Sequence, residues 1–136
     1  MTKIKAVLDT NVILSSIFWK GKEHEVVKKG LEGAYVLVTS KDIVDEVVRK
    51  LRDKFKFPED KIGELLVLLK HFCEIITIKT RLKIVTEDPT DDKIIETAVD
   101  GNADFIVTGD KHLLKLKEYK GIKILKSREF LKLIEK

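Results

Sequence analysis

Apolar residues along this chain follow two patterns, short unbroken runs and longer stretches with helical spacing. The unbroken runs at 6–8 and 34–38 predict strands covered on both faces, because such strands are apolar without alternation; short, largely apolar segments at 74–78, 104–107 and 122–125 predict three further strands. Helical spacing predicts helices at 12–18, 23–31, 41–51, 58–72, 93–99, 111–116 and 128–134. This alternation predicts a single α/β domain over residues 1–136, with three α/β/α layers and a central parallel sheet.

Polar residues mark where several of these elements begin. Thr39 or Ser40 is expected to cap the helix after the second strand, and Ser127 the last helix. Residues 79–89 carry no helical period and are predicted to form a loop. The helix at 58–72 is apolar on a wide face, which leaves two interpretations: burial against the sheet, or a surface for a subunit or partner.

Composition and charge limit the class of protein. A chain of 136 residues with 43% hydrophobic residues fits one globular domain. The formal net charge of +4 permits an anionic partner without requiring one. A single cysteine, Cys73, excludes an intramolecular disulfide and suits a reducing compartment. Because the longest apolar run, 65–69, is too short for a bilayer and no targeting signal is visible, we expect a cytoplasmic protein without membrane association.

Two of the predicted strands lead directly to a carboxylate. Asp9 follows the first strand, and Asp110 follows the fourth after Thr108 and Gly109. A simple interpretation of Asp9 is that it caps the next helix. In a parallel sheet, however, both strands end at the same edge, where ligands bind in open α/β sheets. The helices that carry Glu46 and Asp92 begin at that edge too, so four carboxylates are expected to converge.

Such a cluster is costly unless a cation neutralises it. Two like charges about 4 Å apart repel by roughly 4 kcal/mol at an effective dielectric constant near 20. Carboxylate oxygens are ligands that Mg²⁺ and Mn²⁺ prefer, so either ion is the expected cofactor. The stretch Asp88-Pro89-Thr90-Asp91-Asp92 supports this expectation. A helix cap and the helix dipole explain two of its carboxylates, and the third is surplus.

The same residues resemble a known family, the PIN domain. The resemblance covers essentially the whole chain and rests on four motifs in order: Leu8-Asp9-Thr10-Asn11, the helix that carries Glu46, Asp92 followed by Ile95 and Ala98, and Thr108-Gly109-Asp110. It is closest to PIN proteins identified as toxins of toxin–antitoxin pairs. The resemblance implies a metal-dependent endoribonuclease that cleaves single-stranded RNA with metal-activated water. It also implies a protein antitoxin as partner.

The resemblance further implies roles for individual residues. The catalytic metal ligands would be Asp9, Glu46, Asp92 and Asp110, with Asn11 and Thr108 holding the carboxylates in place. Asp92 is preferred to Asp91 because its spacing to Ile95 and Ala98 fits the family helix, which leaves Asp91 as a cap or supporting group. Beyond the resemblance, an acid-lined site repels phosphate, so basic side chains are needed to bind RNA. The candidates are Lys41, Arg49, Lys50 and Lys111.

Other functions fit parts of the pattern. The loop at Asp9 resembles the nucleophile loop of Mg²⁺-dependent phosphatases of the haloacid dehalogenase type, but Asn11 stands where a second Asp is expected. An inactive RNA- or partner-binding PIN-like module is disfavoured because all four acids are present. If the 2′-hydroxyl of RNA were the nucleophile, His112 would be the residue near enough to act as base. The apolar helix 62–72 and residues 17–19 predict a homodimer or a higher homo-oligomer.

Overall fold

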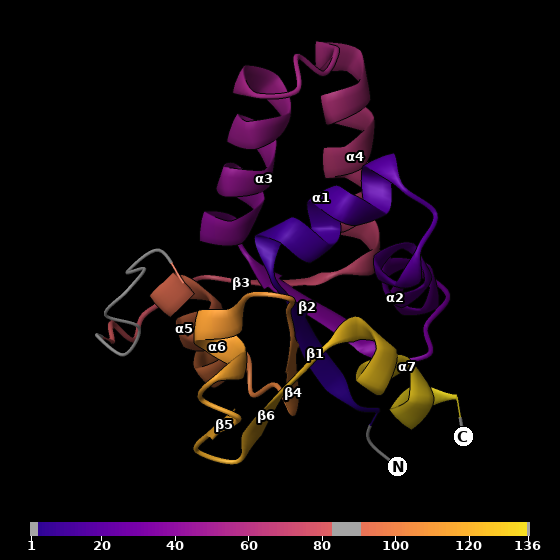
Figure 1. Ribbon diagram of the computed structural model, residues 1–136. Helices are drawn as coiled ribbons and strands as arrows, with labels where there is room; N and C mark the ends of the chain where they lie inside the picture. The colour runs from indigo at the N-terminus through magenta and orange to yellow at the C-terminus, as the bar shows by residue number, and fades with distance from the viewer. Residues whose placement is uncertain (1–2, 83–90, 136) are drawn as a thin grey trace.

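A sheet of six strands forms the centre of the computed structural model, which describes residues 3–82 and 91–135 (Figure 1). The strand order is β3-β2-β1-β4-β6-β5. The strands are β1 (Lys5–Leu8), β2 (Val36–Ser40), β3 (Glu74–Ile76), β4 (Phe105–Val107), β5 (Glu118–Tyr119) and β6 (Ile122–Leu125). Neighbouring strands are parallel except for β5, which pairs with β6 in the antiparallel sense. The predicted α/β fold with a central parallel sheet is confirmed, and β5 was not predicted.

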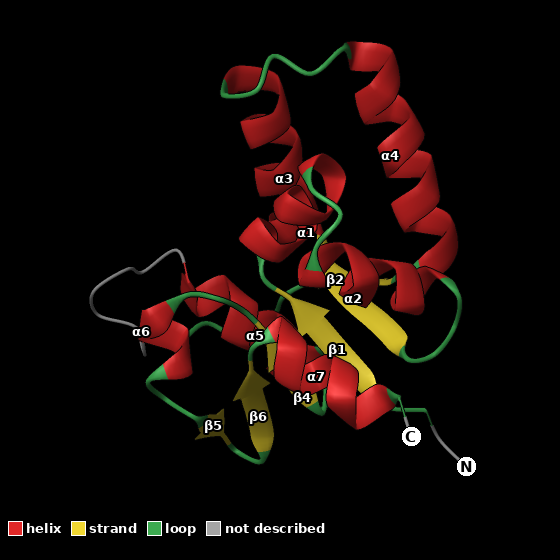
Figure 2. Cartoon of the chain, turned by 45° about the vertical axis from the view of Figure 1, so that its right-hand side comes forward, coloured by secondary structure: helices red, strands yellow, loops and turns green. Residues whose placement is uncertain are grey.

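Seven helices in the described part of the chain surround this sheet. They are α1 (Thr10–Phe18), α2 (Lys22–Leu31), α3 (Lys41–Asp53), α4 (Glu59–Phe72), α5 (Asp92–Asp100), α6 (Lys111–Leu114) and α7 (Ser127–Ile134). Figure 2 shows α5 and α6 on one side of the sheet and α2 and α7 on the other. The long helices α3 and α4 stand side by side beyond the carboxyl edge, with α1 beside them.

The unbroken apolar runs mark the centre of the sheet. Ala6, Val7 and Leu8 of β1 have no exposed surface, since β1 lies between β2 and β4 and helices cover both faces. Their burial places Asp9 at the point where β1 leaves the core. The short connection from β1 to α1 fixes this position, because α1 begins at the next residue, Thr10.

Three local predictions have different outcomes. Ser40 caps α3, because its hydroxyl accepts a hydrogen bond from the Ile43 amide at 3.3 Å. The predicted Ser127 cap is wrong: Lys126 occupies the cap position of α7, and its amide donates to Glu129 Oε1 at 3.1 Å. In the predicted loop 79–89, residues 79–82 form neither helix nor strand. Residues 83–89, with Asp88 among them, lie outside the described residues.

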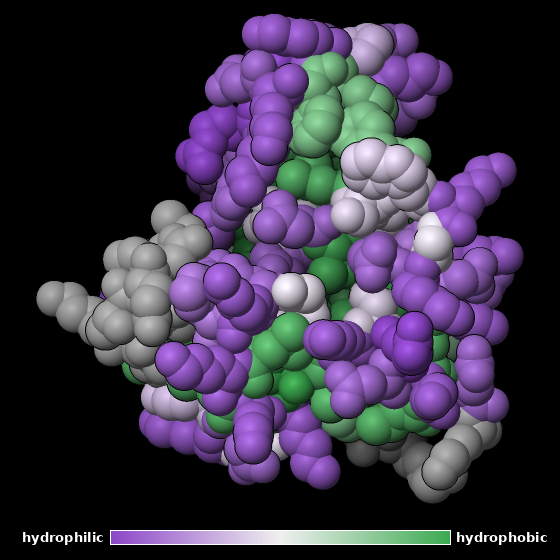
Figure 3. Space-filling view, viewed as in Figure 1, coloured by the Kyte–Doolittle hydropathy of each residue, from purple (hydrophilic) through white to green (hydrophobic). Residues whose placement is uncertain are grey.

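Helix α4 combines the two interpretations that its sequence allowed. Ile62 and Leu69 are buried, whereas Val67 and Phe72 are 69% and 48% exposed. Trp19, which follows α1, is also exposed at 64%. Figure 3 shows apolar surface gathered around the upper helices α3 and α4. One face of α4 therefore packs on the domain and the other stays open. Among the described helices, none is long and apolar enough to cross a membrane.

Candidate active site

A small polar cavity of about 60 Å³ lies at the carboxyl ends of β1 and β4. The starts of α1, α5 and α6 and the second turn of α3 supply its lining residues. Its lining residues are Asp9, Thr10, Asn11, Glu46, Lys50, Asp91, Lys93, Ile94 and Asp110. Three of the four predicted acids thus come together from three separate parts of the chain, and Asp91 joins them.

The position of Asp91 differs from the sequence-based preference for Asp92. Both residues are buried, but Asp91 lines the cavity and Asp92 does not. Helix α5 begins at Asp92, so Asp91 occupies its cap position, and Ile94 three residues later lines the same cavity. Residues three apart lie on one face of a helix. The geometry therefore favours Asp91 as the fourth acid of the cavity.

Asp9 is held at the end of β1 by contacts with β4. Its side chain is 5% exposed, and Oδ2 accepts a hydrogen bond from Thr108 Oγ1 at 2.6 Å. Asp9 stands at the N-cap position of α1, but a cap alone would not need the buried hydrogen bond from Thr108 on the neighbouring strand. Burial raises the pKa of Asp9 above its usual value. Hydrogen bonds from Thr108 and the Asn11 amide oppose this shift, and the negative charges of Asp110 and Glu46 add to it.

Thr108 also fixes Asp110. The Thr108 hydroxyl oxygen accepts a hydrogen bond from the Asp110 amide at 2.9 Å, so one side chain positions both acids. Asp110 Oδ1 in turn accepts from the His112 amide at 2.7 Å and caps α6. His112 thus contributes its backbone, and its imidazole does not line the cavity. Asn11 is exposed and lines the cavity beside Asp9.

Two cations, Lys50 and Lys93, contact Glu46, and the sequence analysis singled out only Lys50. Its Oε1 accepts a hydrogen bond from Thr10 Oγ1 at 3.3 Å and pairs with Lys93 Nζ, while Lys50 Nζ lies 3.1 Å from Oε2. Burial tends to raise the pKa of Glu46, but the hydrogen bonds and charges of Lys93 and Lys50 outweigh burial and lower it. Thr10 and Lys93 were not predicted. The signal for Lys93 was its place directly after two consecutive acids, at the start of a helix.

With this geometry established, comparison with known proteins identifies the family. A family model described as the PIN domain matches residues 5–112, a range that contains all the acids of the cavity. The chain belongs to the PIN domain family. PIN domains are in general nucleases. A search of curated proteins finds none that matches this chain.

A solved structure supports the fold of this PIN domain. It is the crystal structure of VapBC2 from Rickettsia felis bound to a DNA fragment from their promoter. The chain of that structure shares 18% sequence identity with this one and superposes with a TM-score of 0.63. The match covers 89% of this chain and 97% of that chain. At this identity the likeness concerns the fold, and it confirms the predicted architecture.

The cations predicted to bind RNA are spread over the PIN domain. Lys50 lines the cavity, but its ammonium group pairs with Glu46. Lys41, Arg49 and Lys111 are exposed and lie outside the cavity. Lys41 instead lines a separate, mostly apolar groove between α3, α4 and β3. The structure therefore does not bring the four predicted cations together as one basic surface.

The donor set of the cavity suits a hard divalent cation. Its acids are carboxylates, and the residues that line it include neither Cys nor His. Burial raises the pKa of Asp9 most, the negative charges of Asp110 and Glu46 raise it further, and a bound cation would relieve that repulsion. Within residues 3–82 and 91–135, no three Asp, Glu, His or Cys side chains lie close enough together to hold a metal ion in this conformation. Lys93 and Lys50 hold Glu46 instead.

Proposed function

We propose that this PIN domain is a metal-dependent endoribonuclease that hydrolyses single-stranded RNA. The observation that carries the proposal is the convergence of Asp9, Glu46, Asp91 and Asp110 on one polar cavity at the carboxyl edge of the sheet. Carboxylates from separate elements are a costly arrangement for a structural role alone. Membership of a family whose members are generally nucleases supports the same conclusion.

The four acids would hold Mg²⁺ or Mn²⁺ as oxygen ligands. A divalent cation bound there supplies charge that makes water a stronger nucleophile and stabilises the oxygens of the phosphodiester as it is cleaved. The Thr108 hydroxyl keeps Asp9 and Asp110 at fixed positions for this task. Glu46 becomes available when Lys93 and Lys50 move away from it. Their ammonium groups then remain within reach of a bound phosphate.

A toxin role with a protein antitoxin as partner is part of the proposal. It rests on the resemblance of the acidic motifs to those of toxin PIN proteins. The likeness to a chain of VapBC2, which was crystallised with a promoter DNA fragment, is consistent with this role. Co-expression with the product of a neighbouring gene should relieve growth inhibition caused by this chain. The Asp110→Asn variant should cause no inhibition.

The test of the proposed reaction is cleavage of a panel of single-stranded RNAs. Activity should require Mg²⁺ or Mn²⁺ and disappear with EDTA. The products should carry a 5′-phosphate and a 3′-hydroxyl, and a substrate with one 2′-deoxy sugar at the cleaved position should still be cut. Asp45→Asn, which changes an exposed carboxylate one residue from Glu46, is the matched control and should keep full activity. Cleavage that persists in EDTA and leaves a 2′,3′-cyclic phosphate contradicts the proposal.

One observation favours a second candidate, a PIN-like module that binds partners without cleavage. Glu46 is paired with two ammonium groups, which already neutralise it without a metal. The two candidates differ in metal binding. If the domain is a nuclease, Mg²⁺ or Mn²⁺ should raise the melting temperature of the wild type but not of Asp9→Asn. If neither ion changes the melting temperature of the wild type, the binding module is the better description.

Self-association completes the proposal. The exposed side chains of Val67, Leu68, Phe72 and Trp19 form the apolar surface that a second copy would cover. Light scattering should therefore report a species larger than the 15.6 kDa monomer. Val67→Glu and Phe72→Glu should shift that species to the monomer. A wild type that remains monomeric at micromolar concentrations contradicts this part.

A further inference from the structure

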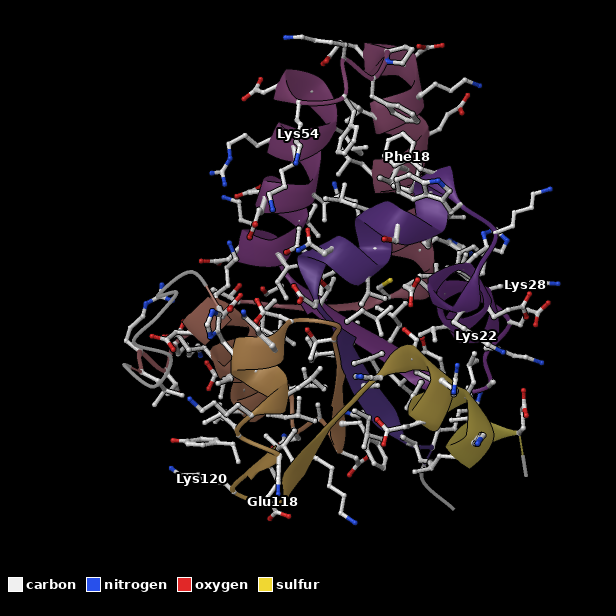
Figure 4. The ribbon with its side chains drawn as sticks, in the orientation of Figure 1. Phe18, Lys22, Lys28, Lys54, Glu118 and Lys120 are labelled. Carbon is white, nitrogen blue, oxygen red and sulfur yellow. The ribbon has the colours of Figure 1, made fainter. Side chains whose placement is uncertain are left out.

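A second groove, with a volume of about 710 Å³, lies between α2 and α7 and extends to Thr108 and Gly109, beside the candidate active site. Its lining residues are Lys22, Glu23, Thr108, Gly109, Lys126, Ser127, Arg128 and Glu129. Helices α2 and α7 pack against each other, and Figure 4 shows Lys22 at the start of α2, close to α7. Thr108 donates to Asp9, and Gly109 precedes Asp110. The groove therefore ends one residue before Asp110, which lines the acidic cavity, so the two lie next to each other at the end of β4.

The basic residues of this groove differ from Lys50 and Arg52 of α3, which form ion pairs. In the part of the chain that the structure describes, Lys22, Lys126 and Arg128 are exposed and form no ion pair with a carboxylate. By contrast, Lys50 pairs with Glu46, and Arg52 of α3 pairs with Glu59. Cations without a carboxylate partner can bind phosphate without first breaking an ion pair. The start of α7 adds the positive end of a helix dipole to the same groove.

The groove is also open where it lies beside the site. Gly109 is exposed, and a Cβ placed on it would meet no atom within 4 Å. Gly109 therefore places no side chain between the groove and Asp110, the next residue, which lines the acidic cavity. Glu23 and Glu129 also line the groove, and the Glu129 carboxylate accepts a hydrogen bond from the Lys126 amide. The Glu23 and Glu129 carboxylates are the groups that would oppose an anionic strand.

On the basis of the proposed nuclease function, we infer that this groove binds the RNA strand on one side of the cleaved phosphate. Lys22, Lys126 and Arg128 contact its phosphates, and the strand passes Gly109 to reach the acids. The path follows α2 and α7. It does not cross the exposed cations Lys41 and Arg49 of α3, which the sequence alone had suggested.

This path predicts a specific salt dependence. For single strands the logarithm of the binding constant falls with the logarithm of salt concentration by about 0.7 for each phosphate contact. Loss of three contacts should therefore make that slope shallower by about 2. At 50 mM salt the affinity should fall on the order of 100-fold.

The experiment measures binding separately from cleavage. Fluorescence anisotropy with a labelled single-stranded RNA in EDTA compares the wild type with Lys22→Gln/Lys126→Gln/Arg128→Gln over a range of salt concentrations. The control, Lys28→Gln/Lys120→Gln/Lys132→Gln, removes the same charge from exposed positions outside the groove. Figure 4 shows Lys28 and Lys120 at the periphery of the molecule. The control should keep the wild-type slope, and both triple variants should keep the wild-type melting temperature.

Two further variants test the path with opposite signs. Glu23→Gln removes one of the two opposing charges and should tighten RNA binding several-fold. Gly109→Leu places a side chain between the groove and Asp110 without backbone strain, because the φ angle of Gly109 is not positive. It should weaken binding of RNA that must pass this residue. A mononucleotide probe at the groove should bind as before.

The outcomes separate this inference from the proposed function. If the groove variant binds RNA with the wild-type affinity and slope while the wild type cleaves RNA, the inference is wrong and the nuclease function stands. If Lys41→Gln/Arg49→Gln/Lys111→Gln weakens binding instead, the strand follows α3 and the inference is also wrong. If the wild type neither binds nor cleaves any RNA of the panel, both proposals are wrong.

Discussion

Helix α5 carries carboxylates at its two ends that have different environments. At its start Asp91 lines the acidic cavity together with Asp9, whose pKa is raised by burial and by neighbouring negative charges. At its end Asp100 accepts hydrogen bonds from the Thr80 amide at 2.9 Å, the Thr80 hydroxyl at 2.7 Å and the Lys79 amide at 2.6 Å. These bonds lower the pKa of Asp100. Aspartate thus lies among other carboxylates at the start of the helix and among hydrogen-bond donors at its end.

Two carboxylates of α5, on Glu96 and Asp100, bind residues 79–82 through hydrogen bonds. Glu96 is buried, and its Oε2 accepts from the Leu82 amide at 2.7 Å, while Arg81 lies 3.4 Å from Oε1. With Asp100 it holds residues 79–82 against α5. Carboxylates that find donors within the chain stabilise the fold, because a buried or ordered charge needs hydrogen bonds. The carboxylates of the cavity also have partners within the chain, but there the negative charges of Asp110 and Glu46 act on Asp9, and such repulsion favours a cation. Four predictions test this difference.

The largest effect is expected in the acidic cavity, at Asp110. Asp110→Asn should lower the rate of RNA cleavage by roughly 100-fold or more, since even residues that only support metal ligands cost 10- to 100-fold when changed. In EDTA its melting temperature should equal or exceed that of the wild type, because one crowded charge is removed and the amide oxygen can still accept from His112. Full activity with Mn²⁺, or a protein that fails to fold, would show that Asp110 is structural.

A change at Asp100, at the other end of α5, should instead lower stability without affecting metal binding. Asp100→Ala should lower the free energy of unfolding by about 2 kcal/mol, because three hydrogen bonds to a charged group are lost from a partly exposed site. Metal binding should be unchanged. Urea denaturation measures the first quantity and calorimetric titration with Mn²⁺ the second. Asp45→Ala, at an exposed position of α3, should change neither. A stable Asp100→Ala protein would mean that residues 79–82 do not depend on α5.

A smaller effect is expected from the cation that neutralises Glu46. Lys93→Met removes a positive charge that competes with a metal for Oε1, so the affinity for Mn²⁺ should rise about tenfold, or ~1.4 kcal/mol. Titration calorimetry compares it with Lys41→Met, which removes an exposed charge from α3 and should leave the affinity unchanged. A lower affinity in Lys93→Met would show that Lys93 supports the metal site rather than competing for it.

The finest test is the dependence of stability on pH in EDTA. Because folding lowers the pKa of Asp100, its stabilising contribution is present above the unfolded value near 3.8 and is lost as the pH falls through the folded value. The deficit of Asp100→Asn should therefore shrink below about pH 4. Because folding raises the pKa of Asp9, its ionised form costs stability at neutral pH. Asp9→Asn should be more stable than the wild type there, and this gain should vanish as the pH falls below 3.8. Parallel curves for the two variants would contradict the comparison.

The sequence by itself determined the sheet and the edge at which the acids meet. Unbroken apolar runs identify strands buried on both faces, and burial is a property that local composition records. Parallel strands then bring Asp9 and Asp110 to one edge, whatever the details of packing. The match of the PIN domain model over residues 5–112 confirms the family that these motifs resembled.

Tertiary structure decided which neighbouring residues reach the site. Asp92 was preferred for its spacing to Ile95 and Ala98, but Asp91 lies four residues before Ile95 and seven before Ala98, spacings that also place residues on one helix face, so spacing did not settle the choice. The choice depends on the rotation of α5 about its axis, which its packing on β1, β2 and β4 fixes. The pairing of Lys93 with Glu46, and the groove that joins Lys22 to Arg128, link residues distant in the chain. Local periodicity cannot encode such pairs, because they exist only after the helices have packed.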